Sequence, residues 1–485
     1  MATAEAGMQS RGLRSNALAM RDVVVMALAS SGPTQSIAVS LAAIVAASGY
    51  AGILPIFICL IPMLGIAIGY QRLNAWQPEA GATYSWVGRA ISPYAGFFAG
   101  WIMLLYYTVG TTSLTIPLGT YLLSLINSSL PNNNVAVGIT GSLLNILVLV
   151  VAAMGIKLSA RFQWGWAFFE YALLMLFAGI ALYNIYGRNL HGSVHLSGSW
   201  FTISGAGGMS GLVAGILIAI FLYSGWDTAA YVGEETRDKK AGAAAITSVV
   251  LLFFIYALAV FAFQGVVPNS QLQAHAGNIL AFVASRLAGS LWGKLMVIAV
   301  LGGTLASLQA AIVSSSRISF AMGRDRVFPK FFAGTHSRFG TPWNATILLG
   351  LLNVVFLWGS LEIGPIGTAL SDIISTLGLY AAIFYALTAS AAIWYFRRTI
   401  ASSTSNLIVA GFLPAVGVAF MLFVIIYSLA NHTLTGVELI FGVGLAILGL
   451  VLALVSRVVT RASFYTTPLA SAGREEEVSG SGHAP

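Results

Sequence analysis

Two acidic residues lie inside apolar stretches of the sequence that have no basic residue in their middle. Glu170 lies in the first half of the stretch 162–187, and Asp227 is similarly deep within the stretch 209–233. An ionised carboxylate at membrane depth is costly unless it is paired or hydrated, so each acid either takes up a proton or meets a cation. Both residues are therefore candidates for chemistry with protons or amines.

Glu170 is predicted to be the proton-coupling residue. Burial of a carboxylate favours its protonated form, and a carboxylate whose exposure changes during a transport cycle can load and unload a proton. Two alternatives remain open for Glu170: it is a sodium ligand, or it is a protonated acid that only makes a structural hydrogen bond.

The stretch AIFLYSGWDTAAYVGEETR (219–237) predicts a helix that is interrupted within the membrane. Residues 211–234 would span about 36 Å as a helix, which is enough to cross a bilayer. Helix is least stable where glycine follows a small hydroxyl residue, as it does at Ser224-Gly225. Interrupted helix at this depth is tolerated where it lines a cavity or is buried in protein. A substrate site is therefore predicted here; the alternative is a glycine kink with Asp227 bonded to a neighbouring helix.

A second interruption is predicted in the first apolar stretch, where Ser30-Ser31-Gly32-Pro33 occurs. Proline lacks an N–H and disfavours helix for the residue before it, so the helix should open near Ala29–Ser31; a simple proline kink is the alternative. An amino acid could present its carboxylate to the freed N–H groups and its ammonium to carbonyls near Leu222–Ser224. The predicted substrate-binding residues are Ser30, Ser31, Gly32, Thr34, Tyr223, Ser224, Gly225, Trp226 and Asp227.

Specific roles in substrate binding are predicted for three of these residues. Tyr223 and Trp226 could close over the substrate or contact its ammonium through their rings, although Trp226 could equally be a packing contact. Asp227 is expected to act on the substrate's amine or on the interrupted backbone.

The stretch 292–321 carries small hydroxyl residues that could form an ion site, with Ser314 and Ser315 as its candidates beside Ser307 and Ser316. The alternative is that these residues only permit close helix packing. After them, Arg317, Arg324 and Arg326 are predicted to be cytoplasmic anchors and inner-gate partners of Glu234, Glu235 or Asp325. Such pairs are expected to be exposed and therefore weak.

The composition indicates the class of protein in which these residues lie. Of the 485 residues, 58% are hydrophobic and only 8% are charged, which excludes a soluble enzyme and indicates a membrane protein with many spans. The twelve predicted spans are 22–46, 50–72, 94–126, 134–156, 162–187, 209–233, 242–266, 292–321, 342–361, 366–396, 406–429 and 434–457.

The basic residues are sorted by loop. Of the 23 Lys and Arg residues, all but Arg188, Arg286 and Lys294 fall in the tails and one alternating set of loops. The positive-inside rule therefore predicts both termini in the cytoplasm of a multi-pass protein of the cytoplasmic (inner) membrane. The charge of +8 is explained in this way, without a nucleic-acid partner.

Several functions are excluded by what the sequence lacks. The single cysteine, Cys59, cannot form an intrachain disulfide, and the six histidines all fall in loops or the tail, so no metal site and no cofactor is expected. No cleaved signal peptide is evident, and no Walker sequence is present to power transport with ATP.

The two interruptions lie five spans apart, which is typical of a transporter built from inverted repeats. The predicted organisation is a cytoplasmic tail (1–20), a first repeat of spans 1–5 (21–190), a second repeat of spans 6–10 (209–398), spans 11 and 12 (405–458), and a disordered cytoplasmic tail (462–485). Residues 77–93 are predicted to form an interfacial helix with Tyr84 and Trp86 at headgroup depth. Residues 267–290 form a candidate external lid.

Four segments resemble the amino acid–polyamine–organocation (APC) superfamily, and more narrowly its bacterial amino acid permeases. They are PEAGATYSWVGRAISPYAGFFAGW (78–101), GIKLSARFQ (155–163), FLYSGWDTAAYVGEETRD (221–238), and SLQAAIVSSSRISFAMGRDRVFPKFF with GTPWNA (307–332 and 340–345).

The resemblance implies an all-α membrane protein of twelve transmembrane helices with a leucine-transporter-type core. Five plus five inverted helices would hold the substrate between broken helices 1 and 6, with spans 3 and 8 as scaffold. The sequence departs from many relatives at Ser30–Gln35, where they carry a Gly-Ser-Gly-type run. It departs again at Glu170, where many relatives carry a lysine that resembles a built-in substitute for sodium.

The function predicted from the sequence is a secondary active transporter, not an enzyme, that moves amino acids by alternating access with proton coupling. The alternatives are a polyamine or organic amine transporter, an amino acid exchanger, a sensor, and a membrane-embedded enzyme. Sodium is the alternative coupling ion, the lipid bilayer is the expected surrounding, and no oligomeric state is predicted.

Overall fold

The computed structural model describes residues 13, 15–127, 130–275, 278–363, 366–431, 434, 436–467 and 469. Within these ranges the secondary structure is helical, apart from one isolated parallel bridge between Leu18 and Thr236. Most of the two predicted tails lies outside the described residues. Residues 463–465, at the start of the predicted C-terminal tail, form a 3₁₀ turn whose Phe464 ring stacks on Tyr84 at 5.0 Å.

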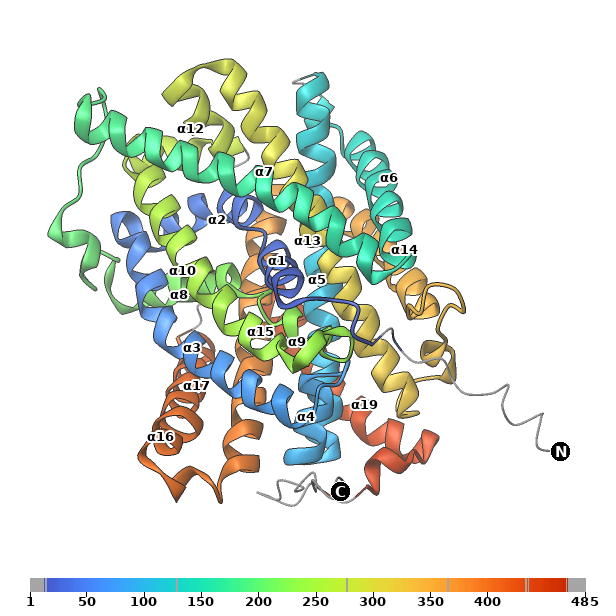
Figure 1. Ribbon diagram of the computed structural model, residues 1–485. Helices are drawn as coiled ribbons and strands as arrows, with labels where there is room; N and C mark the ends of the chain where they lie inside the picture. The colour runs from blue at the N-terminus through green and yellow to red at the C-terminus, as the bar shows by residue number, and fades with distance from the viewer. Residues whose placement is uncertain are drawn as a thin grey trace, which may run out of the picture.

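The first part of the chain folds into short and long helices that follow each other closely (Figure 1). They are α1 (Met20–Ser31), α2 (Pro33–Ser48), the 3₁₀ turn Gly49–Gly52, α3 (Ile53–Trp76), α4 (Thr83–Ala90), α5 (Pro93–Ile126), α6 (Asn134–Ala153), α7 (Ile156–Leu182) with a π-helical end (Tyr183–Gly187), α8 (Gly208–Tyr223), α9 (Thr228–Tyr231) and α10 (Ala241–Gln264).

The second part continues in the same way. It consists of α11 (Asn269–Ala274), α12 (Ile279–Ala288), α13 (Ser290–Arg324), α14 (Trp343–Ile363), α15 (Ile366–Phe396), α16 (Thr404–Asn406), the π-helix Leu407–Phe412, α17 (Leu413–Ala430), α18 (Gly436–Glu438), the π-helix Leu439–Gly444 and α19 (Leu445–Thr460).

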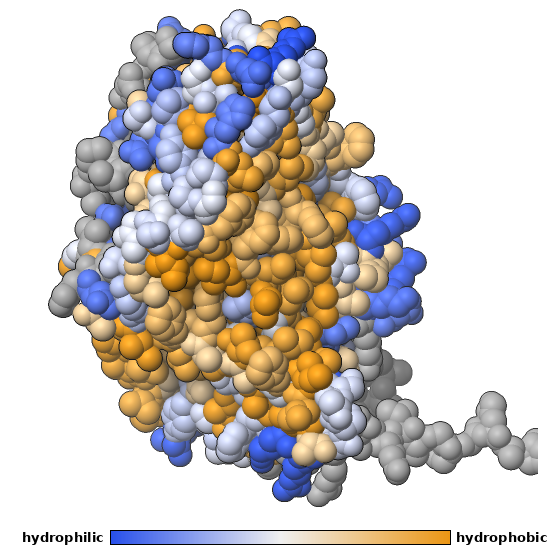
Figure 2. Space-filling view, turned by 90° about the vertical axis from the view of Figure 1, so that its left-hand side faces the viewer, coloured by the Kyte–Doolittle hydropathy of each residue, from blue (hydrophilic) through white to orange (hydrophobic). Residues whose placement is uncertain are grey.

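The described residues contain 11 helical segments that are long and apolar enough to cross a membrane. One of them, Met20–Trp76, is 57 residues long and contains α1, α2 and α3. Figure 2 shows apolar residues over the middle of one face, with hydrophilic residues toward its upper and lower edges. Large apolar side chains such as Phe168 and Val458 are exposed on this scaffold. Such a surface fits lipid rather than water, and the protein is a multi-pass membrane protein.

Helix α13 lies at the centre of the bundle and is the most buried of the candidate spans. It packs against α5, α7, α1 and α14, and small residues let it approach them closely. A Cβ at Gly302 would overlap the Trp166 ring of α7, and a Cβ at Gly303 would overlap the Glu170 carboxylate. The segments that contain α17 and α19 are the least buried. Helix α13 is thus the scaffold on which the candidate site is built.

The predicted interfacial helix corresponds to α4, which lies near one end of the bundle (Figure 1). Tyr84 and Trp86 of this helix are fully buried within the protein. The Tyr84 hydroxyl donates to Asp325 Oδ2 at 2.9 Å, and Trp86 Nε1 donates to the Gln77 carbonyl at 2.7 Å. Their polar atoms are satisfied inside the protein, so these rings do not need the interface.

Candidate functional site

The first element of the site is the gap between α1 and α2. Helix α1 ends at Ser31, Gly32 has a left-handed backbone (φ 50°, ψ 64°), and Pro33 is the first residue of α2. A side chain at Gly32 would also overlap the Ser307 hydroxyl, so glycine is required here both by its φ and by the close approach of α13. The N-terminus of α2, with its free N–H groups, therefore begins in the interior of the bundle.

The second element is the gap between α8 and α9. Helix α8 ends at Tyr223, and helix resumes only for the four residues of α9, beginning at Thr228. Gly225 has a φ of 105°, and a Cβ there would lie 2.7 Å from the Ser31 nitrogen. The two interruptions therefore touch each other, backbone against backbone.

A pocket opens where the two gaps meet. Its empty volume is about 440 Å³, a figure that includes open solvent. The end of α1 contributes Ser30 and Ser31, and the gap after α8 contributes Ser224 and Gly225. The rest of the lining comes from α2 (Gln35 and Ser36), from α5 (Tyr106, Tyr107, Gly110, Ser113 and Leu114), and from Phe221, Ser307, Ala311 and Leu377.

Four of the nine predicted substrate-binding residues, Ser30, Ser31, Ser224 and Gly225, line this pocket. The other five, Gly32, Thr34, Tyr223, Trp226 and Asp227, are not part of the lining. The Trp226 ring stacks on Tyr385 at 5.3 Å, and the Tyr223 hydroxyl donates to the Ile56 carbonyl at 3.1 Å.

Asp227 is buried and bonded within the protein. Its carboxylate accepts hydrogen bonds from Tyr231 at 2.9 Å, Tyr385 at 3.0 Å and Tyr107 at 3.4 Å, and from the Gly225 N–H at 3.1 Å. These donors come from α9, α15, α5 and the gap itself. The acid thereby ties the interrupted segment to two long helices.

Glu170 is fully buried on α7, facing Gly303 of α13. Neither of its carboxylate oxygens accepts a hydrogen bond of good geometry from the described residues. The Thr34 hydroxyl donates to the backbone carbonyl of Glu170 at 3.4 Å. The predicted ion-site residues lie further along α13, where Ser314 bonds Thr228 at 3.2 Å and Ser315 donates to the Ile312 carbonyl.

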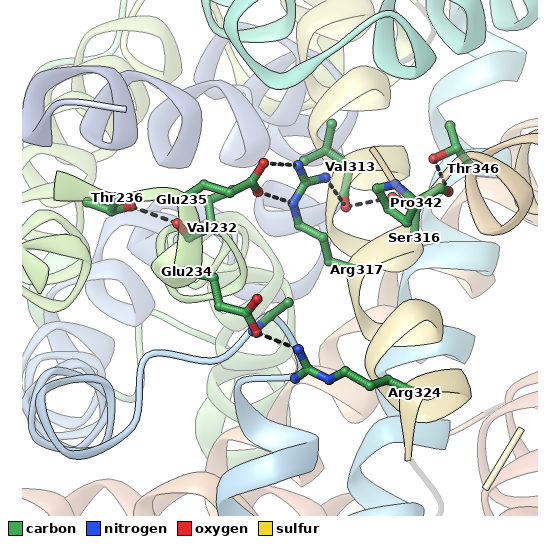
Figure 3. Close-up of polar contacts among 11 residues, drawn as sticks. Val232, Glu234, Glu235, Thr236, Val313, Ser316, Arg317, Arg324, Pro342 and Thr346 are labelled. Atoms are coloured by element: carbon green, nitrogen blue, oxygen red, sulfur yellow. Dashed lines mark hydrogen bonds and ion pairs between the residues drawn. The ribbon is translucent and has the colours of Figure 1, made fainter. Parts of the chain in front are cut away.

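Arg317 and Arg324 of α13 form ion pairs of very different burial (Figure 3). Arg317 Nε and a second guanidinium nitrogen donate to the two carboxylate oxygens of Glu235 at 2.6 and 3.0 Å, and both side chains are buried. Arg324 meets Glu234 at 3.2 Å and Glu79 at 4.0 Å, and it is 40% exposed. The expectation that the gate pairs are exposed is therefore wrong for Glu235–Arg317, whose side chains are 0% and 2% exposed.

Arg326 and Asp325, the other predicted gate residues, have different surroundings from the two pairs above. Arg326 takes part in none of the ion pairs found in the described part of the chain. Asp325, which follows α13, accepts a hydrogen bond from Tyr84, and burial raises the pKa of its carboxyl. Asp325 is therefore held by a tyrosine hydroxyl.

The sequence analysis missed Gln35, Tyr106, Tyr107 and Ser113 as lining residues. The sequence could have indicated Gln35 as a pocket residue, since it is a polar residue two positions after Pro33 in an apolar stretch. The sequence could not have indicated the lining residues of α5, because this helix carries aromatic and hydroxyl residues on several faces.

Comparison with known proteins shows the family to which the chain belongs. Residues 18–452 match the amino acid permease family. The low-affinity putrescine importer PlaP of Escherichia coli K12 is 25% identical over 303 residues, covering 60% of this chain and 64% of the importer. The branched-chain amino acid permease BcaP of Lactococcus lactis is 23% identical over 335 residues, covering 65% and 70%. The vacuolar cationic amino acid transporter 4 of Arabidopsis thaliana is 24% identical over 297 residues, covering 58% and 48%. The chain thus matches less than two thirds of the length of the first and third of these relatives.

Proposed function

The chain belongs to the amino acid permease family, a family of permeases and not of enzymes, and on that premise we propose that it is a secondary transporter that carries amino acids across the cytoplasmic membrane by alternating access. The observation that supports this most is the pocket at the meeting point of two interrupted helices. Interrupted helices at membrane depth bring backbone N–H and carbonyl groups to a substrate without exposing them to lipid.

We further propose that Met20–Trp76 crosses the membrane twice, which makes twelve spans in all. Its 57 residues would extend about 85 Å as one helix, far more than a bilayer requires. The two gaps then fall in spans 1 and 6, which supports two inverted five-helix repeats over 21–190 and 209–398. The loop distribution of Lys and Arg supports cytoplasmic termini.

The proposed substrate pose uses both gaps. The carboxylate lies at the N-terminus of α2, where unpaired N–H groups and the helix dipole favour an anion. The ammonium lies toward the end of α8, where the carbonyls of residues 222–224 and the lining hydroxyls accept hydrogen bonds. Asp227 acts through the protein, by holding Gly225 in place, rather than on the amine.

We propose Glu170 as the coupling residue, and protons as the coupled ion. Its burial and its lack of well-formed hydrogen bonds support a carboxylate that is protonated in this conformation. The close approach of the Glu170 carboxylate to Gly303 lets its charge state influence how α7 and α13 pack.

The experiment that tests the function starts from purified full-length protein. A thermal-shift screen against the standard amino acids and diamines is expected to find at least one amino acid that raises the melting temperature, since a ligand stabilises the state it binds. That amino acid should then accumulate in proteoliposomes under an inward proton gradient. Binding without any uptake or exchange would overturn the transport proposal and favour a sensor.

Gly225→Ala is expected to reduce uptake at least tenfold. The added Cβ would lie 2.7 to 2.9 Å from backbone atoms of Ser30 and Ser31, and alanine disfavours a φ of 105°, so the two gaps should separate. Gly179→Ala is the matched control, because a Cβ at that helical glycine contacts nothing within 4 Å. Equal uptake by both variants would show that contact between the gaps is not required.

A further inference from the structure

Helix α7 carries a row of buried polar residues on the face that packs against α13. Ser159, Gln163 and Glu170 are each 0% exposed. They lie four and seven positions apart, so they follow one another along one face of the helix over about 16 Å. The row leads from Glu170 to the end of α7 that begins at Ile156, which the proposed topology places at the cytoplasm.

Gln309 of α13 faces this row. The side-chain amides of Gln163 and Gln309 share one hydrogen bond of 2.7 Å, and both residues are fully buried. One such bond leaves an oxygen and an NH₂ group of the pair unused, whichever way the two amides are turned. Neither of these groups has a partner among the described residues, and the same is true of the Ser159 hydroxyl. Buried polar groups of this kind are usually satisfied by ordered water.

Small residues line the seam between the amide pair and Glu170. Ala167 of α7 and Ala306 of α13 are both buried there, and each lies about one turn from the glutamine of its own helix. Gly303 lies one turn beyond Ala306 and faces the Glu170 carboxylate. Because these residues have little side-chain volume, a small separation of α7 and α13 is enough to admit water molecules between the polar groups.

Glu170 is the residue of this seam that can change its charge near neutral pH. Among the described residues, the titratable side chains beside it are Tyr171 of α7 and Tyr256 of α10. Tyrosines remain protonated at neutral pH. Toward the cytoplasmic end of α13 the first basic residue is Arg317, and it is paired with Glu235. A proton that leaves Glu170 in this direction therefore needs neutral carriers such as water.

We propose that Glu170 exchanges its proton with the cytoplasm along this seam, through water molecules held by Gln163, Gln309 and Ser159. The inference rests on the proposed coupling role of Glu170 and adds the route which that role requires. In the release step the O–H bond of the carboxylic acid breaks, the proton passes to a water, and each water hands one proton on until the cytoplasm receives one. A carboxylate remains, and the amides only orient the waters. None of the three water-holding residues lines the pocket, so proton and substrate take separate paths.

Gln163→Met/Gln309→Met tests this route, because methionine has about the length of glutamine but no amide. The primary measurement is the rate at which Glu170 exchanges its carboxyl proton for deuterium when purified full-length protein is transferred to D₂O. Infrared spectroscopy follows the carbonyl band of the protonated acid, which is identified by its absence in Glu170→Gln. The double variant is expected to slow this exchange at least tenfold. In proteoliposomes, proton-driven accumulation of the amino acid found in the thermal-shift screen should slow by a similar factor, while counterflow exchange stays within about twofold.

Asn145→Leu/Asn353→Leu is the matched control. These two residues join α6 to α14 by an amide–amide bond of 2.8 Å, and both are buried. Their replacement is expected to leave the deuterium exchange of Glu170 and the accumulation within about twofold of wild type. Melting temperature and amino acid binding check that each variant is folded. Where the double methionine variant does not fold, Ser159→Ala removes one hydroxyl from the row and is expected to slow the deuterium exchange about threefold.

The outcomes separate this inference from the transport proposal. Deuterium exchange and accumulation at wild-type rates in the seam variants would overturn the inference and leave the transport function intact. Equal slowing in the asparagine control, or loss of counterflow together with accumulation, would also overturn it, because the glutamine pair would then only support packing. Slowed deuterium exchange at Glu170, in a protein that carries out neither uptake nor exchange of amino acids, would support the route and overturn the transport proposal.

Discussion

Glu170→Gln is expected to abolish the accumulation of substrate against its gradient while leaving exchange of internal for external substrate within about twofold of wild type. Glutamine has nearly the same size and polarity as a protonated glutamate, so the packing against Gly303 should persist. It cannot release a proton, so the cycle loses its link to the proton gradient. The variant should therefore equilibrate the amino acid without concentrating it.

The measurement uses proteoliposomes with and without an inward proton gradient, and a counterflow assay for exchange. Asp238→Asn is the control, because it neutralises an acid that is 75% exposed outside the spans. Proton-driven accumulation that is unchanged in the Glu170 variant would exclude this residue as the coupling device. Accumulation that follows a sodium gradient in wild type, and is lost in the variant, would instead assign Glu170 to a sodium site.

The positions of the two gaps follow from local chemistry that the sequence shows directly. Gly32-Pro33 combines a left-handed glycine with a residue that cannot donate to the preceding turn, and α1 ends one residue earlier. Ser224-Gly225 lies where α8 ends. Apolar length and the loop distribution of basic residues likewise depend on local composition, and so does the family resemblance, which the family match confirms.

What lies against each side chain did not follow from the sequence. Asp227 was expected to act on a substrate amine or on the interrupted backbone, and it does accept a hydrogen bond from the Gly225 N–H. Its other partners, Tyr107, Tyr231 and Tyr385, come from positions up to 158 residues away. Only the packing of α5 and α15 around the gap brings these hydroxyls together. The burial of Tyr84 and Trp86 has the same origin, since helix α4 is covered by other parts of the chain that no local pattern reveals.

The burial of the Glu235–Arg317 pair also could not be predicted from the sequence, and it leads to a prediction about the stability of the protein. Arg317→Met is expected to destabilise the protein by about 3–5 kcal/mol, because it leaves the Glu235 carboxylate buried without its partner. The double variant Arg317→Met/Glu235→Leu should recover most of that loss, since two apolar residues can replace a buried ion pair. Arg324→Met, at a pair whose arginine is 40% exposed, should cost less than about 1 kcal/mol. Thermal melting of the purified variants in one detergent gives the order of the effects.

The double variant also decides whether the pair acts as an inner gate. The pair joins α13 to the segment that follows α9 (Figure 3). A gate at this position would open by the separation of these two elements. A gate without its ion pair should open more often, and the only native cysteine, Cys59, is buried. A cysteine introduced at the pocket residue Ser113 should therefore react severalfold faster with a reagent supplied from the cytoplasmic side in the double variant than in the matched background with the pair intact. Recovered stability with an unchanged labelling rate would show that Glu235–Arg317 holds the fold together without controlling access to the pocket.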